Sequence, residues 1–140
     1  VIFFLGKSPV SWQSQKQRVV ALSSCEAEYM AATAAACQGI WLSRLLGEML
    51  NKEAARPILL VDNKSAISLA KNPVFHDRSK HIEIRYHFIC ECVEQGRILI
   101  DYMRTSDQLV DALTKALGRL IFQGLKKRIG MVEIIRQHQD

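Results

Sequence analysis

Residues 23–50 read SSCEAEYMAATAAACQGIWLSRLLGEML, a long stretch rich in alanine and leucine. Ser23 and Glu26 match a capping box, in which a serine hydroxyl and a glutamate satisfy backbone N–H groups at the start of a helix. Alanine and leucine are among the residues that favour helix most. The stretch therefore predicts a helix that is capped by Ser23 and ends near Leu50.

The segments on either side of this helix have strand patterns. Val1–Leu5 and Val10–Trp12 predict two strands, joined by a hairpin turn at residues 6–9, and residues 18–22 continue in an extended conformation. After the helix, Ile58–Val61 is a short continuous apolar run of the kind found in buried strands. Residues 98–103 predict one more strand.

Further helices are predicted after Ile58–Val61. A short helix begins at Asn63 and ends before Pro73, and a second covers residues 79–95 and is closed by Gly96. A capping box at Thr105 predicts a third helix that reaches Leu117. A last amphipathic segment carries Phe122, Leu125 and Ile129. This order predicts an α/β fold with a mixed sheet flanked by helices. We expect residues 1–117 to form the domain and residues 118–140 a C-terminal amphipathic helix and tail.

Composition is that of an intracellular globular domain. The 140 residues suit one domain, and 49% hydrophobic with 24% charged residues is ordinary for such a chain. The opening apolar run, Val1–Leu5, is too short for a signal peptide or a membrane span, and its lack of a starting Met makes us expect a piece of a longer protein. The four cysteines show no C-x-x-C spacing, which favours a reducing, cytoplasmic setting.

Positive charge is spread unevenly. The net charge is +5; residues 1–25 contain three basic residues and no acid, and residues 115–136 contain six Lys or Arg against Glu133. Such clusters suit a polyanionic partner, but an ordinary solvated surface explains them equally well. Charge alone does not decide between the two.

Two glutamates lie close together at the start of the long helix. Glu26 shares a mostly polar face with Thr33 and Arg44, and it is interpreted as part of the cap. Glu28 shares a face with small and apolar residues from Ala31 to Met49, which we expect to be the buried face. Burying a carboxylate there costs free energy unless a cation or hydrogen bonds compensate it. Glu28 is therefore either a functional residue or a partly exposed acid at the start of the helix.

Two aspartates could likewise be either functional or purely structural. Asp62 directly follows the apolar strand Ile58–Val61, and sites in α/β proteins gather at the carboxyl ends of strands. The alternative is that Asp62 or Asn63 simply caps the next helix. The helical pattern around Asp111 places it opposite Leu109 and its apolar neighbours, which by itself favours a solvated residue.

Several motifs, in order over nearly the whole chain, resemble one family closely. The chain is similar to the RNase H domain of copia-type, plant-like retrotransposon Pol polyproteins. The motifs are WQSQKQ (residues 12–17), VALSSCEAEY (20–29), VDNKSA (61–66), NPVFH (72–76), RSKHI (78–82), RYHF (85–88) and DQLVDALTK (107–115).

The resemblance implies an RNase H-like fold and an endonuclease that hydrolyses the RNA strand of RNA–DNA hybrids during reverse transcription. Its partners would be the hybrid and the reverse transcriptase domain of the same polyprotein, with no membrane. The family's catalytic acids, which are also its metal ligands, carry over onto Glu28, Asp62 and Asp111. They imply two Mg²⁺ ions, or Mn²⁺ in their place.

One departure from the family pattern concerns the first strand. The family has a fourth acid there, whereas no acid precedes Glu26 in this chain, so we expect the first strand to be missing. The loop Arg104–Ser106 also lacks the histidine that some related nucleases carry. Lys16, Lys64 and Arg104 are candidates for contacts to nucleic-acid phosphates.

Three other interpretations compete. His76, His81, His87, Cys90 and Cys92 are close in sequence, but their spacing fits no standard zinc site. An integrase places its glutamate on a late helix, after two aspartates, whereas here the glutamate comes first. The strongest rival is a catalytically inactive, truncated relic that at most binds nucleic acid.

Overall fold

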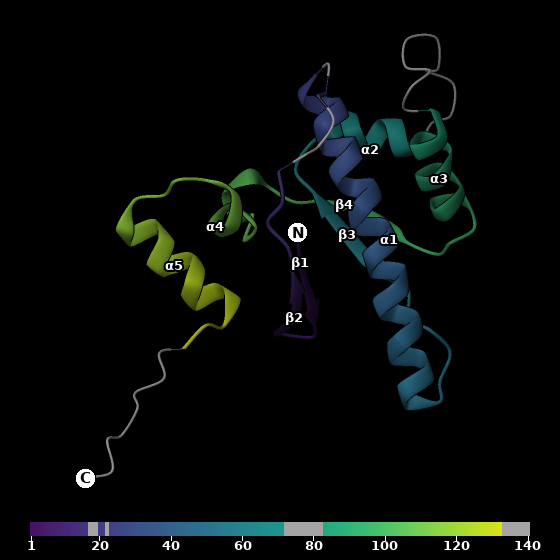
Figure 1. Ribbon diagram of the computed structural model, residues 1–140, viewed down its shortest axis with the longest axis horizontal. Coiled ribbons are helices and arrows are strands. Elements are labelled where there is room, and N and C mark those ends of the chain that lie inside the picture. Colours follow the sequence, from purple (N-terminus) through teal and green to yellow (C-terminus); the bar gives the residue numbers. More distant parts are fainter. Residues whose placement is uncertain (17–19, 22, 72–82, 133–140) are drawn as a thin grey trace. The chain divides into compact units, whose positions relative to one another are not determined.

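The computed structural model describes residues 1–16, 20–21, 23–71 and 83–132. The chain divides into two compact units. One consists of Val1–Lys16 together with Gln108–Asp140, and the other is Gln17–Asp107. Within the described ranges the fold is mixed α/β with two small sheets, and Figure 1 labels the elements.

The first unit begins with a β-hairpin, as predicted. Strands β1 (Ile2–Leu5) and β2 (Ser8–Trp12) pair antiparallel, and the pairing of Leu5 with Ser8 leaves Gly6 and Lys7 as the turn. Gly6 has φ +62°, a conformation that tight hairpin turns demand and that glycine adopts without steric cost. The turn is shorter than expected because Ser8 and Pro9 already belong to β2.

Two helices complete the first unit. Helix α4 (Asp111–Thr114) is followed by α5 (Arg119–Ile129), whose Leu125 and Ile129 are buried. The hydroxyl of Ser14, just after the hairpin, donates a hydrogen bond to the carbonyl of Leu113 (2.8 Å). The hairpin and α4 are therefore connected within this unit.

The helix expected from Thr105 to Leu117 is wrong as one element. The structure has a 3₁₀ turn, η1 (Thr105–Asp107), then the four-residue α4, and Lys115 leaves helical geometry with φ −123° and ψ 144°. Gly118 is also extended and precedes α5. Glycine is among the least favourable residues in a helix interior, so a break beside it is physically reasonable.

The second unit contains the long helix α1 (Ser24–Leu50), which begins as predicted. The Ser23 hydroxyl oxygen accepts a hydrogen bond from the backbone N–H of Glu26 (3.1 Å). At the other end Asn51 adopts the left-handed conformation with φ 50°, which closes the helix. Both ends of this helix are therefore set by local interactions.

The face that α1 buries agrees with the expected one only in part, since Ala35 and Gly39 are buried as expected. Tyr29 and Ala36 are almost fully buried, whereas Met49, on the expected face, is 75% exposed. Tyr29 lies about 100° around the helix from Glu28. The reason for the difference is tertiary, because α1 packs against α2, α3 and β3 on the side that Tyr29 occupies.

Strands β3 (Ile58–Val61) and β4 (Leu99–Tyr102) form a two-stranded parallel sheet. The pairing aligns Leu59 with Ile100, and both are buried. On the opposite face of this sheet Ile58, Leu60 and Leu99 are exposed. In place of the expected single mixed sheet, the described residues thus contain one antiparallel and one parallel pair.

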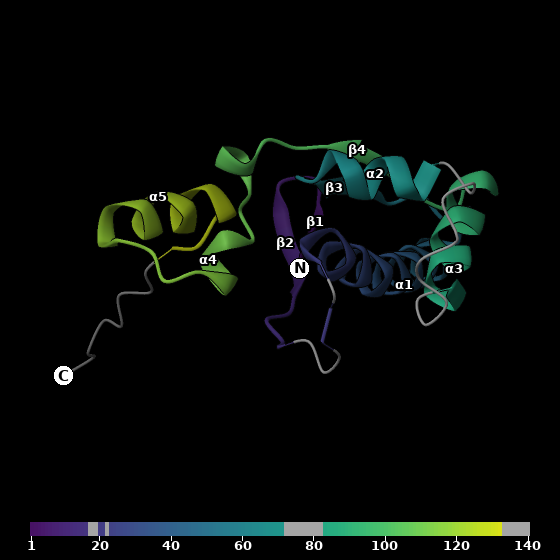
Figure 2. The ribbon, with the colours of Figure 1, turned by 90° about the horizontal axis from the view of Figure 1, so that it is seen from above.

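Helices α2 (Lys64–Lys71) and α3 (Glu83–Glu94) lie between these strands in the chain. Helices α1 and α3 pack together, as both views show (Figures 1 and 2). The core of the unit includes Ile89 and Cys92 of α3, and Ile98 just before β4. Pro73 and the first residues of the helix expected at 79–95 lie outside the described residues.

The end of α3 matches its predicted cap. Gly96 has φ +63°, its N–H donates to the carbonyl of Val93 (3.0 Å), and the N–H of Arg97 donates to that of Cys92 (2.8 Å). This pair of bonds is the Schellman motif, which satisfies carbonyls at a helix end. The cap directs the chain from α3 into β4. Residues 18, 19 and 22 of the expected extended segment lie outside the described part.

Candidate functional site

Asp62 lies where β3 ends and α2 is about to begin. The side chain of the next residue, Asn63, accepts hydrogen bonds from the N–H groups of Ser65 (2.9 Å) and Ala66 (3.1 Å). Asn63 is therefore the cap of α2. Of the two residues that the sequence offered as the cap, the structure thus uses Asn63, and Asp62 beside it is half-buried.

The carboxyl ends of β3 and β4 meet at the same edge of the parallel sheet. Val61 pairs with Tyr102, and the N–H of Met103 donates to the carbonyl of Val61 (3.0 Å). Residues just after the two strands, Asp62 on one side and Arg104 on the other, are thereby brought to this edge. Such edges are where ligands bind in open α/β sheets.

Glu28 lies on the first turns of α1 and is half-buried. Its Oε2 atom has almost no access to solvent. Glu26 is more buried than Glu28, with 8% of its surface exposed. The sequence had predicted the opposite, with Glu28 on the buried face and Glu26 on the polar one. Glu28 is thus only half-buried, although Ala35 and Gly39 on the same side of α1 are buried.

Asp111 belongs to the first unit, whereas Glu28 and Asp62 belong to the second. It is the first residue of α4, and its Oδ2 lies 3.0 Å from the Nζ of Lys115, one helical turn later. Its side chain is 19% exposed, so it is less solvated than the helical pattern indicated. The carboxylate of Asp111 is therefore ion-paired with a lysine of its own segment.

The described residues contain no group of three or more His, Cys, Asp or Glu side chains that could hold a metal ion. Of the histidines and cysteines weighed for zinc, His76 and His81 lie outside the described residues. Cys90 and Cys92 are both buried. Burial raises the pKa of the Cys92 thiol, and the nearby Arg97 partly opposes this rise.

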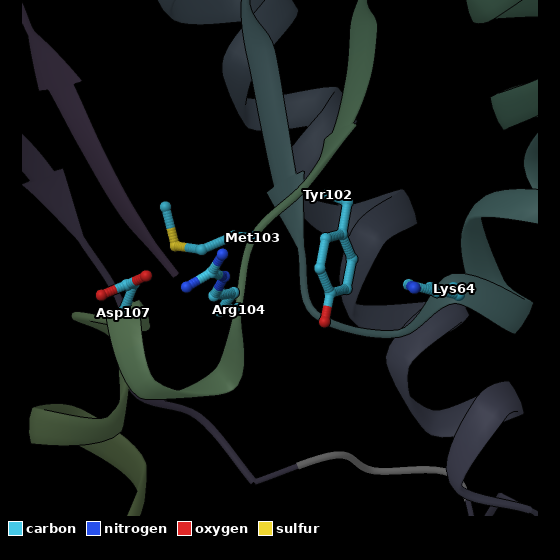
Figure 3. A pocket seen from close by; sticks show the side chains of 5 residues that line it. All are labelled: Lys64, Tyr102, Met103, Arg104 and Asp107. Carbon is cyan, nitrogen blue, oxygen red and sulfur yellow. The ribbon is translucent and has the colours of Figure 1, made fainter.

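An open pocket of about 750 Å³ lies at the edge where β3 and β4 end, and Figure 3 shows its lining. Two of the predicted phosphate-binding residues, Lys64 and Arg104, line it, with Tyr102, Met103 and Asp107. The third, Lys16, belongs to the other unit and is exposed. The structure thus groups two basic residues that are 40 positions apart in the chain.

Three residues of this pocket, Tyr102, Met103 and Asp107, were not singled out from the sequence, and Tyr102 interacts with one that was. Tyr102 is the last residue of β4, and the ammonium of Lys64 lies 5.1 Å from the centroid of its ring. The sequence signal available for Tyr102 was an aromatic residue near the end of a predicted strand, two positions before the basic Arg104. It was weak, because aromatic residues are common in strands for packing reasons alone.

Fold and site together define a mixed α/β chain with acidic and basic side chains at the carboxyl edge of a parallel sheet. Comparison with known proteins shows similarity to retrovirus-related Pol polyproteins from transposons RE2 and RE1 of Arabidopsis thaliana, each 41% identical over 133 residues, or 95% of the chain. The corresponding polyprotein from transposon TNT 1-94 of Nicotiana tabacum is 40% identical over 93% of the chain. These three homologues are thus retrovirus-related Pol polyproteins from plant transposons.

The chain spans about a tenth of the length of these relatives, 9% of the first two and 10% of the third. No family model matches the chain, and no solved structure matches it either. None of the helices in the described part of the chain is long and apolar enough to cross a membrane.

Proposed function

We propose that this chain is an RNase H-type endonuclease domain of a retrotransposon polyprotein, which hydrolyses the RNA strand of RNA–DNA hybrids. The observation that carries the proposal is the position of Asp62 at the carboxyl edge of the parallel sheet, with helix capping left to Asn63. Similarity to Pol polyproteins over nearly the whole chain supports the same conclusion. The reverse transcriptase domain of the same polyprotein is the proposed partner.

Glu28, Asp62 and Asp111 are the proposed metal ligands and catalytic residues. Carboxylate oxygens are the donors that Mg²⁺ and Mn²⁺ prefer. Glu28 and Asp62 are half-buried, where water screens the attraction between a carboxylate and a cation less than at an exposed site. Two such ions held by these carboxylates would orient a water molecule and stabilise charge on the attacking and leaving oxygens.

Basic side chains would hold the nucleic acid in this proposal. Lys64 and Arg104 already line one pocket, and Lys16 is exposed. Contacts to phosphates position the strands without reading sequence. Selectivity for the hybrid would come from 2′-hydroxyl contacts across the minor groove.

The test is cleavage of an end-labelled RNA–DNA hybrid in the presence of Mg²⁺. Because no acid precedes Glu26 and the family pattern has one on its first strand, the chain is compared with a chimera. In the chimera the chain follows the segment that precedes the matching region in the RE1 polyprotein of Arabidopsis thaliana. We expect the chimera to cut the RNA strand, and Asp62→Asn to abolish the cutting.

A matched control is Asp101→Asn, since Asp101 is an exposed aspartate of the adjacent strand β4. It should cut like the unchanged chimera. If the chimera folds, as judged by a cooperative melt, but does not cut, the nuclease proposal fails. The chain is then an inactive relic that at most binds nucleic acid.

A further inference from the structure

The pocket at the ends of β3 and β4 combines features that phosphate binding alone does not require. Besides Lys64 and Arg104 it is lined by an aromatic ring, a thioether and a carboxylate. Its volume of about 750 Å³ is within the range of sites that hold small molecules. All five lining residues belong to the same unit of the chain.

Tyr102 is the central side chain of this pocket. Its ring is 43% exposed although it ends a strand whose neighbouring residue, Ile100 on the same face, is buried. Figure 3 shows Lys64 on one side of the ring, and Met103, Arg104 and Asp107 on the other. An ammonium 5.1 Å from the centroid forms a cation–π interaction, which helps to hold both side chains in place.

This set of groups matches the chemistry of a nucleotide. An exposed aromatic ring offers a face to a base, and adjacent cations bind its phosphate, which is the pattern of single-strand binding sites. The carboxylate of Asp107 can accept hydrogen bonds from amino groups on a base edge. A purely phosphate-binding site would gain nothing from the ring, and a carboxylate would weaken it.

The ring also distinguishes an unpaired base from a paired one. Bases inside a duplex are covered on both faces by their neighbours, so they offer no free face to an isolated side chain. A base in a single strand does offer one. A stacking platform at this edge is therefore suited to an unpaired nucleotide.

We propose that the pocket formed by Lys64, Tyr102, Met103, Arg104 and Asp107 binds one unpaired nucleotide of a nucleic-acid strand. The base stacks on Tyr102, and the phosphate contacts Lys64 and Arg104. The inference rests on the proposed function for the class of ligand, a nucleic acid, but it requires neither a metal ion nor cleavage. Binding measured in EDTA therefore separates its failure from the failure of the nuclease proposal.

The experiment uses the full 140-residue chain and a short single-stranded oligothymidylate with one internal 2-aminopurine. Affinity is measured by fluorescence anisotropy, and stacking by the quenching of 2-aminopurine. We expect Tyr102→Ala to weaken binding about tenfold or more and to abolish the quenching, because stacking on one aromatic side chain is worth about that much. Tyr102→Phe, which keeps the ring, should bind within about threefold of the unchanged chain.

Two matched controls show whether the effects are specific to the pocket or follow from the loss of any exposed aromatic or basic residue. Trp41→Ala removes another exposed aromatic residue of the same unit and should leave binding and quenching unchanged. Lys64→Gln should lower the dependence of affinity on salt by the equivalent of about one phosphate contact, whereas Lys52→Gln, which removes an exposed lysine after α1, should not. Circular dichroism of each variant shows whether it is folded.

Three results would overturn the inference. Equal binding by Tyr102→Ala and the unchanged chain shows that the ring is not a platform. Equal loss in Tyr102→Phe and Tyr102→Ala shows that the hydroxyl, not the stacking face, matters. The same dependence on Tyr102 for a fully paired RNA–DNA hybrid with blunt ends shows that the pocket does not select an unpaired nucleotide.

Discussion

At the scale of single residues, the neighbours Asp62 and Asn63 have separate roles at the end of β3. Asn63 satisfies two backbone N–H groups of α2, and Asp62 contributes nothing to that cap. A carboxylate that is half-buried without a capping role is available for ligand binding. Asp62 and Asn63 should therefore differ in what they contribute to the stability of the folded chain.

We expect Asn63→Ala to lower the free energy of unfolding by about 1 kcal/mol, the usual cost of losing an N-cap side chain. Asp62→Asn should change it by less than about 0.5 kcal/mol, because it removes no cap. Urea denaturation followed by circular dichroism measures both. A loss for Asp62→Asn as large as for Asn63→Ala would show that Asp62 supports the fold directly.

Burial also sets the chemistry of the cysteines. Cys37 is exposed, whereas Cys90 and Cys92 are buried, and burial raises the pKa of Cys92. Since the thiolate is the reactive form, we expect a thiol reagent at pH 8 to modify Cys37 first and Cys92 only after unfolding. Mass spectrometry of the labelled peptides identifies each site. Fast labelling of Cys92 in the folded chain would contradict this prediction.

The same shift predicts a pH dependence. In the unfolded chain Cys92 loses its proton near its ordinary pKa of about 8.5, but in the folded chain only at a higher pH. Its contribution to stability is therefore complete below pH 8 and is lost as the pH rises through the pKa of the folded state. Cys92→Ala should flatten this fall in the free energy of unfolding between pH 8 and pH 10.

At the scale of elements, the β3–β4 pair has one packed face and one open face. Leu59 and Ile100 point to the packed face, and Ile58, Leu60 and Leu99 are exposed on the other. Parallel sheets usually have both faces covered. Neighbouring leucines of the same strand should therefore differ strongly in what they contribute to stability.

We expect Leu59→Ala to destabilise the chain by about 2–4 kcal/mol, because it removes buried apolar volume. Leu60→Ala, one residue later on the open face, should cost less than about 1 kcal/mol. Thermal and urea unfolding compare the two variants. Similar losses would mean that the outer face of the sheet is also packed in solution.

Glycines at different places in the helices have different roles. Gly96 has φ +63° in the cap of α3, whereas Gly124 lies inside α5 with open space around the position of a Cβ atom. We expect Gly96→Ala to destabilise by about 1 kcal/mol, because an L-residue is strained there. Gly124→Ala should stabilise by about 0.5–1 kcal/mol by favouring helix. Opposite shifts in melting temperature would agree with both statements.

At the scale of the whole molecule, each unit leaves large apolar side chains exposed. Phe4 and Trp12 are exposed on the hairpin of one unit, and Ile58, Leu60 and Leu99 on the sheet of the other. Exposed apolar patches and open sheet edges favour association. The net charge of +5 opposes it by mutual repulsion.

We therefore expect the isolated chain to associate at high concentration, and more so when salt screens its charge. The double substitution of Ile58→Lys and Leu60→Lys should reduce association while shifting the melting temperature by only a few degrees. Light scattering at several salt concentrations measures this. Association that weakens with salt would show that charge, and not apolar surface, drives it.

Elements whose signals are local could be predicted from the sequence. It located the hairpin, the Ser23 cap of α1, the strand before Asp62 and the Gly96 cap of α3, because each depends on residues within a few positions of one another. It also pointed to the family of plant Pol polyproteins through several motifs in order. The roles of Glu28, Asp62 and Asp111 as metal ligands stay a prediction from that resemblance.

Which surfaces meet depends on packing between distant segments. Packing buries Tyr29 of α1, divides the helix expected between Thr105 and Leu117, and leaves the α2 cap to Asn63. It also placed Lys64 over the ring of Tyr102, 38 residues later. Periodicity cannot predict such contacts, because they depend on which distant segments exclude water together, and that is settled by packing over the whole unit.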